Sequence, residues 1–392
     1  MSLHELEENR DQERILPLFP SLDHHLAMES VIEGNIEGKI LVDSTENPKT
    51  AAVWCSPGNE ALLFLAGKSN NSHFNGKLRS YFVERIRPDS MEKGLDTLQV
   101  YCPHNWEGEL QRIFGNNDVF KDRDSYYKLN SEKFRKLQQN WRENIPHQFI
   151  LKRMEANIFD KAVNVPVFNR LSSWKSFEQF RKRGFAYYLV EKDTHNIVSG
   201  CVTKFATASK CELGIGTDAR YRMRGLATLA VCATVEEALE RGLEVIWECY
   251  HGNTASIRTN QKVGFDYICD EFFYFWFLYE SPKNCLFSGY YCFTELNDPY
   301  KAVDWFRKGI ALSEEEGEPI SSGYNLYAAC AFAAVKEYDR ALEHLHEAVD
   351  GLQDAQQCYD RLKNEKAFDE LRGSKEFKEI VLRVESLLEN DQ

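Results

Sequence analysis

The sequence predicts an α+β protein in which two lobes of mixed strands and helices precede an all-α domain. Between Phe185 and Phe277, short β-type runs alternate with helical segments, and a similar order of runs occurs in residues 30–130. Residues 281–392 repeat internally with a period of 39. We therefore expect domains at 1–145, 146–280 and 281–392, which suits a chain of 392 residues.

The first lobe is expected to open with a helical stretch over Arg14–Ile32. Its strands are predicted from β-rich runs bounded by turn residues, and its helices from apolar periodicity. The expected strands are Lys39–Asp43, Thr50–Cys55, Leu62–Ala66, Thr97–Tyr101 and Ser125–Leu129, and the expected helices are Phe74–Arg87 and Trp106–Phe114.

A charged helical connector over Ser131–Glu143 leads into the second lobe. Helices are predicted at Asn157–Val163, Trp174–Arg183, Gly225–Arg241 and Asn253–Val263, and strands at Phe185–Glu191, Ile197–Phe205, Glu212–Thr217, Glu244–Tyr250 and Phe265–Phe277. Gly242 ends the long helix, because glycine readily adopts positive φ at a helix C-terminus. This order predicts a mixed central sheet with helices on both faces.

In the third domain, the segment around Ala302 matches the segment around Ala341, and Phe293 matches Phe332. Each unit reads as two helices joined by a tight turn, which resembles a tetratricopeptide repeat lengthened by about five residues. Ala302, Ala341 and Ala348 are expected to pack where helices cross. A closing amphipathic segment over Phe368–Phe377 is expected to cap the stack.

Composition excludes several classes of protein. No uncharged apolar run reaches the length of a membrane span, and the N-terminus lacks a secretory pattern. Residues 281–392 carry −9 of the net charge of −13, and the overall acidity argues against nucleic-acid binding. The eleven cysteines lack paired spacing, which fits reduced thiols in a cytoplasmic protein. We expect no metal, and we expect His24 and His25 to lie on the surface.

One turn has the composition of a phosphate-binding site. After the strand Glu212–Thr217, the segment Arg222-Met-Arg-Gly225 leads directly into a helix. The unpaired N–H groups of a helix N-terminus attract anions, and Arg222 and Arg224 add positive charge. A side chain at Gly225 would obstruct an approaching phosphate. A lone glycine at a helix start is commonplace, so the assignment depends on its surroundings.

Those surroundings resemble the GNAT superfamily of N-acetyltransferases. The turn has the Arg/Gln-x-x-Gly-x-Gly/Ala pattern of that family, and a second motif follows in Asn253-Thr-Ala-Ser256 and Lys262-Val-Gly264-Phe265. The resemblance implies acetyl-CoA as the donor. It implies cofactor contacts from the strand end Ile215, Gly216 and Thr217, from the turn Arg222, Met223, Arg224, Gly225, Leu226 and Ala227, and from Asn253 and Ser256.

Two carboxylates are candidates for the base that deprotonates the amine. Glu248 precedes the second motif, and Glu212 begins the cofactor strand; each matches a place where family members carry a catalytic glutamate. Both remain open at this point, and so does the alternative that neither is catalytic. The family's usual acid, a tyrosine, aligns with Asn260, which cannot donate a proton in that role. Tyr250 and Tyr267 lie nearby in sequence, and packing is the simpler role for each.

The first lobe resembles a degenerate GNAT lobe, because Gly67–His73 lacks the Arg-x-x-Gly turn. We expect it to wall the acceptor cleft; an unrelated α+β domain is the alternative. The tandem arrangement resembles a bacterial subfamily that includes the zwittermicin A resistance acetyltransferase. That resemblance implies a small-molecule amine acceptor, such as an aminopolyol or related antibiotic. A protein amine recruited by residues 281–392, or an acyl-CoA-responsive interaction module, are the competing readings.

Overall fold

The computed structural model describes residues 3–6, 13–20, 24–115, 119–162, 168, 173–174, 176–352 and 355–390. The chain forms two compact units, Met1–Leu278 and Tyr279–Gln392. The first unit holds all the strands of the described residues, and the second is helical.

A mixed sheet of twelve described strands runs through the first unit in the order β1-β2-β3-β4-β5-β12-β6-β11-β10-β9-β8-β7. Most neighbouring strands are antiparallel, and the pairs β4–β5 and β10–β11 are parallel. The strands are β1 (His4–Glu5), β2 (Lys39–Val42), β3 (Thr50–Cys55), β4 (Leu62–Gly67), β5 (Thr97–Tyr101), β6 (Phe120–Leu129), β7 (Phe149–Arg153), β8 (Ala186–Glu191), β9 (Ile197–Ala206), β10 (Lys210–Thr217), β11 (Glu244–Tyr250) and β12 (Phe265–Phe277).

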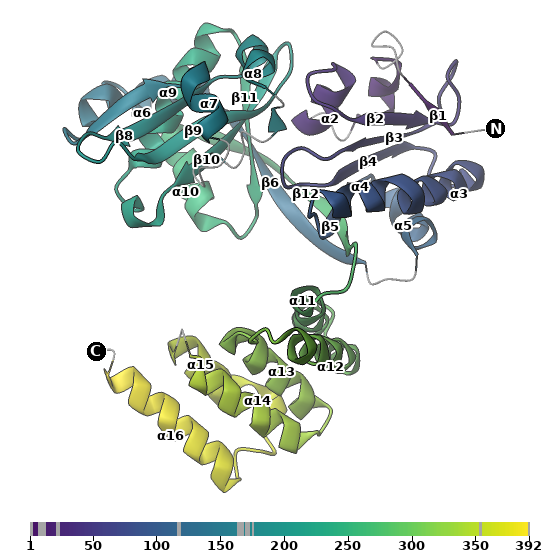
Figure 1. Cartoon of the computed structure of the whole chain (residues 1–392), viewed down its shortest axis with the longest axis vertical. Coiled ribbons are helices and arrows are strands. Elements are labelled where there is room, and N and C mark those ends of the chain that lie inside the picture. Colours follow the sequence, from purple (N-terminus) through teal and green to yellow (C-terminus); the bar gives the residue numbers. More distant parts are fainter. Residues whose placement is uncertain are drawn as a thin grey trace. The chain divides into compact units, whose positions relative to one another are not determined.

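The two halves of this sheet exchange strands. Strand β6 comes from the first half of the unit, yet it pairs with β11 and β12 of the second half. Strand β12 in turn pairs with β5 of the first half. Figure 1 shows β6 and β12 running from one half to the other. The sequence did not indicate this exchange. The exchanged strands place residues of both halves on one continuous sheet surface.

The helices of the first unit are α2 (Leu26–Ile32), α3 (Ser72–Tyr81), α4 (Arg87–Glu92), α5 (Glu107–Phe114), α6 (Ser131–Leu137), α7 (Ala156–Ala162), α8 (Phe177–Arg183), α9 (Leu226–Glu240) and α10 (Thr254–Val263). The short helical turns are η1 (Glu13–Leu18), the π-type η2 (Phe82–Ile86), η3 (His104–Trp106), η4 (Trp141–Asn144) and η6 (Ala219–Tyr221). Helix α9 packs on β8–β11, and α2 contacts β3, β9 and β10, so α2 joins the two halves.

Several sequence expectations were wrong in detail. The helical stretch Arg14–Ile32 is interrupted: η1 contains Pro17, Pro20 follows it, and α2 begins only at Leu26, because proline cannot continue a helix. The connector Ser131–Glu143 is likewise divided into α6 and η4. The helix expected at Phe74–Arg87 extends through η2 and α4 to Glu92. Strand β7 was not expected; it is an edge strand with mostly exposed or half-exposed side chains, so its sequence lacks a strong hydrophobic signal.

The second unit consists of α11 (Pro282–Thr294), α12 (Pro299–Glu316), α13 (Ser322–Ala334), α14 (Tyr338–Asp350), α15 (Ala355–Asn364), the turn η7 (Lys366–Phe368) and α16 (Lys375–Asn390). Helices α11 and α12 pack as one pair and α13 and α14 as another. Ala302, Ala341 and Ala348 are fully buried. The closing segment Phe368–Phe377 is not one helix, because a turn separates η7 from α16, although Phe368 and Phe377 are both buried.

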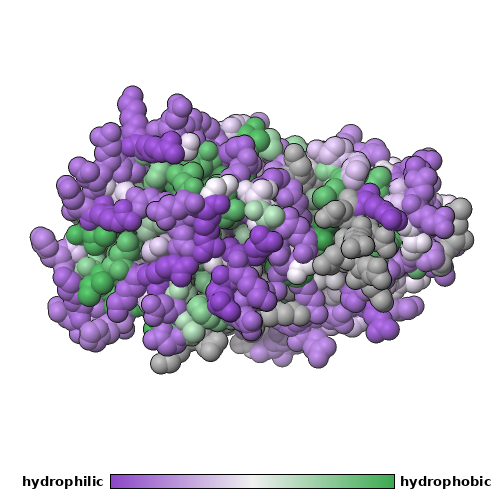
Figure 2. All heavy atoms as spheres, turned by 90° about the horizontal axis from the view of Figure 1, so that it is seen from above, coloured by the Kyte–Doolittle hydropathy of each residue, from purple (hydrophilic) through white to green (hydrophobic). Residues whose placement is uncertain are grey.

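The mostly hydrophilic surface and the burial of nearly all the thiols are typical of a folded chain with hydrophobic cores. Figure 2 shows one face on which hydrophilic side chains predominate, with hydrophobic ones in smaller areas among them. No helix in the described part of the chain has the length and apolar character needed to cross a membrane. All eleven cysteines are free of disulfide bonds, and ten of them are buried.

Candidate functional site

Strands β10 and β11 separate soon after they begin. They pair in parallel from Lys210 opposite Glu244 to Glu212 opposite Ile246. Beyond that point β10 continues to pair with β9, while β11 pairs with β6. The β11-facing edge of Ile215, Gly216 and Thr217 therefore takes no part in the β10–β11 ladder. Backbone N–H and C=O groups on such an edge can pair with an extended ligand.

Helix α9 begins beside this opening. Gly225 is its N-cap residue, with φ of +77°, and no heavy atom lies within 4 Å of where its Cβ would be. The N–H groups of the first helical turn, which starts with Leu226 and Ala227, point out of the helix by its geometry. Met223 also has positive φ (61°) and is 97% exposed. The turn therefore presents open backbone donors at the positive end of a fifteen-residue helix.

Both arginines of this turn are exposed. The Nε of Arg222 donates to the carbonyl of Thr217 at 3.4 Å, which bends the side chain toward the end of β10. The guanidinium of Arg224 lies 5.3 Å from the centroid of the Tyr221 ring. Each can contribute positive charge to an anion at the start of α9.

The second motif, which begins with Asn253 and Ser256, stabilises the local structure around the start of α10. The side chain of Asn253 caps α10 by accepting a hydrogen bond from the Ser256 N–H at 3.1 Å. The Ser256 hydroxyl accepts a hydrogen bond from the buried Trp247 indole at 3.0 Å. These contacts fix the start of α10 against β11.

A small hollow opens over the sheet where β9, β11 and the start of α2 meet, and in this structure it leaves room for no more than about one water molecule. Both halves of the unit and the start of α2 contribute to it. Its lining residues are His25, Leu26, Ala27, Glu60, Leu62, Phe64, Gln99, Tyr101, Lys204, Phe205 and Glu248.

The two candidate bases differ in their surroundings. Glu248 is half-buried and lines the hollow. Glu212 is 2% exposed, and its carboxylate lies 3.5 Å from Nζ of Lys204. A β-bulge places Lys204 there: Phe205 opposes Glu212 and Thr203 opposes Leu213, so Lys204 is the extra residue. Lys204 also lies 3.1 Å from Glu60 of the first half.

Further polar side chains are buried close to Glu248. The Tyr101 hydroxyl donates to Oδ2 of Asp124 at 2.9 Å. Burial, and then the charge of Glu248, raises the pKa of Asp124 to about 8. A carboxyl with that pKa is largely protonated at neutral pH and can donate a hydrogen bond.

The Tyr126 hydroxyl makes a 2.9 Å hydrogen bond with Nδ1 of His25. Burial raises the pKa of Tyr126 well above its ordinary value, and Glu248 adds to this effect. Burial lowers the pKa of His25 well below its ordinary range, with further contributions from His24 and Lys204. His25 is therefore neutral at physiological pH.

The structure differs from the sequence expectations at two histidines and two tyrosines. His25 is 3% exposed and His24 is also largely buried, so neither lies on the surface. The cause is the start of α2, which places both rings against the sheet, with His24 4.3 Å and His25 5.0 Å from the Tyr126 ring. Tyr250 and Tyr267 are 48% and 58% exposed, so neither lies in the core, although their rings contact His251 and Tyr127 at 4.5 and 5.7 Å.

Asn260, which was expected to align with the family's tyrosine, is fully buried in α10. Neither polar atom of its side chain has a hydrogen-bond partner among the described residues. This position therefore offers no proton donor.

The sequence did not single out Tyr101, Asp124, Tyr126 or Lys204. Tyr101 and Asp124 come from the first half, and only the strand exchange brings them beside Glu248. The one available signal was that Asp124 comes directly before the expected strand Ser125–Leu129, which includes Tyr126 and Tyr127.

Comparison with known proteins identifies one matching family and several solved structures with a similar fold. The profile of the GNAT acetyltransferase family matches residues 16–271. A GCN5-related N-acetyltransferase-like protein from Streptococcus suis is 19% identical, with a TM-score of 0.52 over 68% of this chain and 98% of its own. At that identity the likeness shows the fold alone.

Two other solved structures are similar at lower TM-scores. A GCN5-related N-acetyltransferase from Sphaerobacter thermophilus is 17% identical, with a TM-score of 0.48 over 70% of this chain and 95% of its own. A tandem GNAT protein from the clavulanic acid biosynthesis pathway is 11% identical, with a TM-score of 0.45 over 71% of this chain and 99% of its own. No curated protein matches the chain.

Proposed function

Because the chain belongs to the GNAT acetyltransferase family, which transfers acyl groups from acetyl-CoA, we propose that its first unit acetylates a primary amine of a small cationic molecule. The observation that carries this proposal is the hollow beside the separated strands, where the Glu248 carboxylate meets a buried polar cluster.

The donor side of the proposal rests on the start of α9. The open space in front of Gly225 suits a pyrophosphate, which the N–H groups of the first helical turn and the two arginines would hold. The open edge of Ile215–Thr217 suits the amide groups of pantetheine, and Asn253 lies at the far side of the opening. A cofactor held in this way would direct its thioester toward the hollow.

The acceptor side rests on charge. Glu60 and Glu248 line the hollow, and the charged side chain that lines it with them is Lys204, which is paired with Glu60 and Glu212. A surplus of carboxylates attracts an ammonium group. The buried floor at His25 and Tyr101 favours a slender small molecule over a folded protein surface.

Glu248 is the preferred base because it lines the hollow, whereas Glu212 is held by Lys204. In the proposed reaction, Glu248 removes a proton from the ammonium, and the neutral nitrogen attacks the thioester carbon. The new C–N bond gives a tetrahedral intermediate, whose oxyanion a backbone N–H of β10 would stabilise. Collapse of this intermediate re-forms the C=O bond and breaks the C–S bond. The nitrogen then loses its second proton to water, and the CoA thiolate takes a proton from solvent.

The resemblance to the zwittermicin A resistance subfamily makes an aminopolyol or related antibiotic the first acceptor class to test. The second candidate is a protein amine recruited by the second unit, whose paired helices Pro282–Glu316 and Ser322–Asp350 would act as tetratricopeptide-like repeats.

A mass-shift screen of amine libraries and lysine peptides with acetyl-CoA separates these candidates. The first unit has its own core and can be tested as residues 1–278. If this fragment acetylates the same small amines as the full chain, the small-molecule proposal stands. Acetylation confined to peptides, and lost on removal of the second unit, would replace it with the protein acceptor. Absence of any acetylation by a full chain that binds acetyl-CoA would favour an interaction module.

A further inference from the structure

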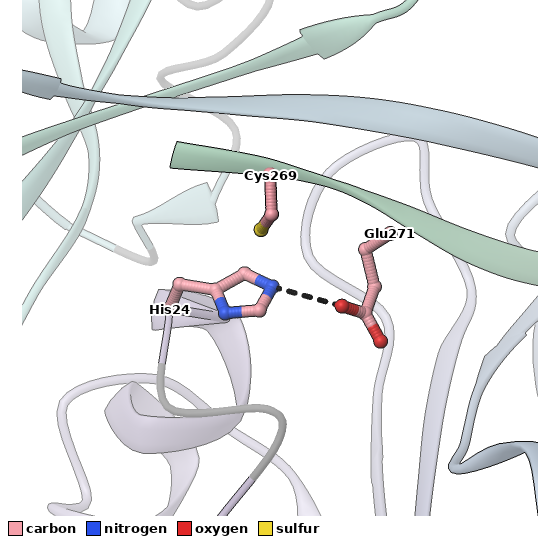
Figure 3. Close-up of side chains that lie close together, drawn as sticks. All are labelled: His24, Cys269 and Glu271. Carbon is pink, nitrogen blue, oxygen red and sulfur yellow. Dashed lines mark ion pairs between the residues drawn. The ribbon is translucent and has the colours of Figure 1, made fainter. Parts of the chain in front are cut away.

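Three side chains of different chemistry converge beside the hollow. The imidazole Nε2 of His24, the thiol of Cys269 and a carboxylate oxygen of Glu271 all lie within 4.8 Å of one another. Figure 3 shows Nε2 of His24 directed at the Glu271 carboxylate, 3.4 Å away, with the Cys269 sulfur on the same side of the strand. No other group of at least three His, Cys, Asp and Glu ligands this close occurs in the described residues.

The backbone explains why they meet. Cys269 and Glu271 are two residues apart on β12, opposite Tyr126 and Asp124 of β6, so their side chains lie on one face of the sheet. A register shift between Tyr267 and Cys269 sets that face. His24 directly precedes His25, the N-cap residue of α2, and its ring packs edge-on against Tyr126.

The donor set selects a class of metal. Imidazole, thiolate and carboxylate together suit a borderline cation such as Zn²⁺, whereas Mg²⁺ and Ca²⁺ prefer oxygen alone. The side chains of His24 and Glu271 are 12% and 21% exposed, so water competes little for them. We propose that His24, Cys269 and Glu271 bind one Zn²⁺, with water completing a tetrahedral site.

No sequence pattern indicated this site, because its ligands are separated by almost the whole first unit and lack any recognisable spacing. The bound ion would fasten the segment before α2 to β12. His25, the next residue, lies in the hollow. Zinc would therefore hold one wall of the proposed acceptor site and take no part in the transfer itself.

Cobalt reports directly on such a site. When the full metal-free chain is titrated with Co²⁺, the visible absorption of tetrahedral cobalt should rise and saturate at one equivalent of metal. A thiolate-to-cobalt band should rise with it in the ultraviolet. Cys269→Ser should abolish the thiolate band, and Glu271→Gln should weaken binding at least about 10-fold, the loss that even an outer-shell change causes. The control is His104→Gln, which removes another histidine–glutamate pair (His104 and Glu107, 3.0 Å) and should leave the spectrum unchanged.

A second measurement uses the unaltered chain, so a variant that fails to fold cannot obscure the answer. Cys269 is the one cysteine of the eleven that is not buried, so a thiol reagent should label it first. Saturating Zn²⁺ should slow that labelling at least about 10-fold, because a metal-bound thiolate is protected. Unchanged labelling with Zn²⁺, or a cobalt spectrum that keeps its thiolate band in Cys269→Ser, would overturn the proposal.

Discussion

The hydroxyl of Tyr101 on β5 donates a 2.9 Å hydrogen bond to Asp124 on β6, although β12 lies between these two strands. The bond thus passes over one strand to connect two segments of the first half around a strand of the second half. Both side chains are buried. This hydrogen bond therefore joins β5 to β6 directly, next to the hollow beside Glu248.

Tyr101→Phe should test that link. Loss of the hydroxyl leaves a buried carboxyl with one partner fewer, so the free energy of unfolding should fall by about 1–2 kcal/mol, measured by chemical denaturation. Acetylation should also slow, because Asp124 is repositioned near Glu248. Tyr188→Phe, a buried tyrosine on β8 that does not line the hollow, is the control. Equal losses of activity in the two variants would show that the Tyr101–Asp124 hydrogen bond has no specific role in acetylation.

Glu248→Gln and Glu212→Gln should fail in different ways. If Glu248 is the base, its replacement should lower kcat by about 10²- to 10⁴-fold with little change in stability. Replacement of Glu212 leaves Lys204 with one carboxylate fewer in a buried site, so it should mainly lower stability. Single-turnover rates and denaturation curves measure both. A Glu248→Gln variant with normal kcat would transfer the role of base elsewhere.

Gly225 and Gly242 form a matched pair at the two ends of α9. Both have positive φ, +77° and +71°, and neither has a heavy atom within 4 Å of the Cβ position. Alanine at either should cost about 1–2 kcal/mol of stability through backbone strain. Only Gly225→Ala should also weaken acetyl-CoA binding, as measured by calorimetry. Equal acetyl-CoA affinities in the two variants would show that the phosphates bind elsewhere.

Glu237 should make the free energy of unfolding depend on pH in the acidic range. Arg153 of β7 donates two hydrogen bonds to it, at 2.8 and 2.7 Å. Burial is the largest single effect and raises the pKa of Glu237, but Arg153, Tyr187 and Arg241 together lower it below its ordinary value of 4.5. Its stabilising contribution is therefore complete above pH 4.5 and is lost as the pH falls through the folded-state pKa.

Glu237→Gln should accordingly lower the free energy of unfolding at pH 7 by about 1.5–3 kcal/mol, the range for hydrogen bonds to charged groups. The difference from the unaltered chain should shrink below pH 4.5. Glu240→Gln, an exposed change on the same helix, should have little effect at either pH. A Glu237→Gln deficit that stays constant as the pH falls would contradict the ion-pair explanation.

The strands and caps that depend on local sequence were predictable. Strands β11 and β12 have the expected bounds, and the helix expected at Asn253–Val263 begins one residue later, with Asn253 as its N-cap. The positive φ of Gly242 likewise follows from its position after α9. Each depends on residues only a few positions apart, so periodicity and capping rules suffice.

What escaped prediction depends on distant partners. His25 is buried because of Tyr126, which lies 101 positions away. Lys204 faces Glu212 because of a one-residue bulge, which leaves no mark in the hydrophobic pattern. Asp124 joins the hollow only because β6 pairs across the two halves. One sequence read locally contains no information on these pairings.

The exchanged strand β6 has a consequence for the way the chain is made. Its neighbours β11 and β12 begin at Glu244 and Phe265, so on the ribosome β6 is finished long before either partner exists. At ordinary synthesis rates that interval is roughly ten seconds, during which both edges of β6 are open to wrong partners. Its charged start, Lys121-Asp-Arg-Asp124, is the kind of sequence that discourages such pairing. Completion of the sheet must wait for residue 277, and the hollow beside Glu248 is enclosed only then.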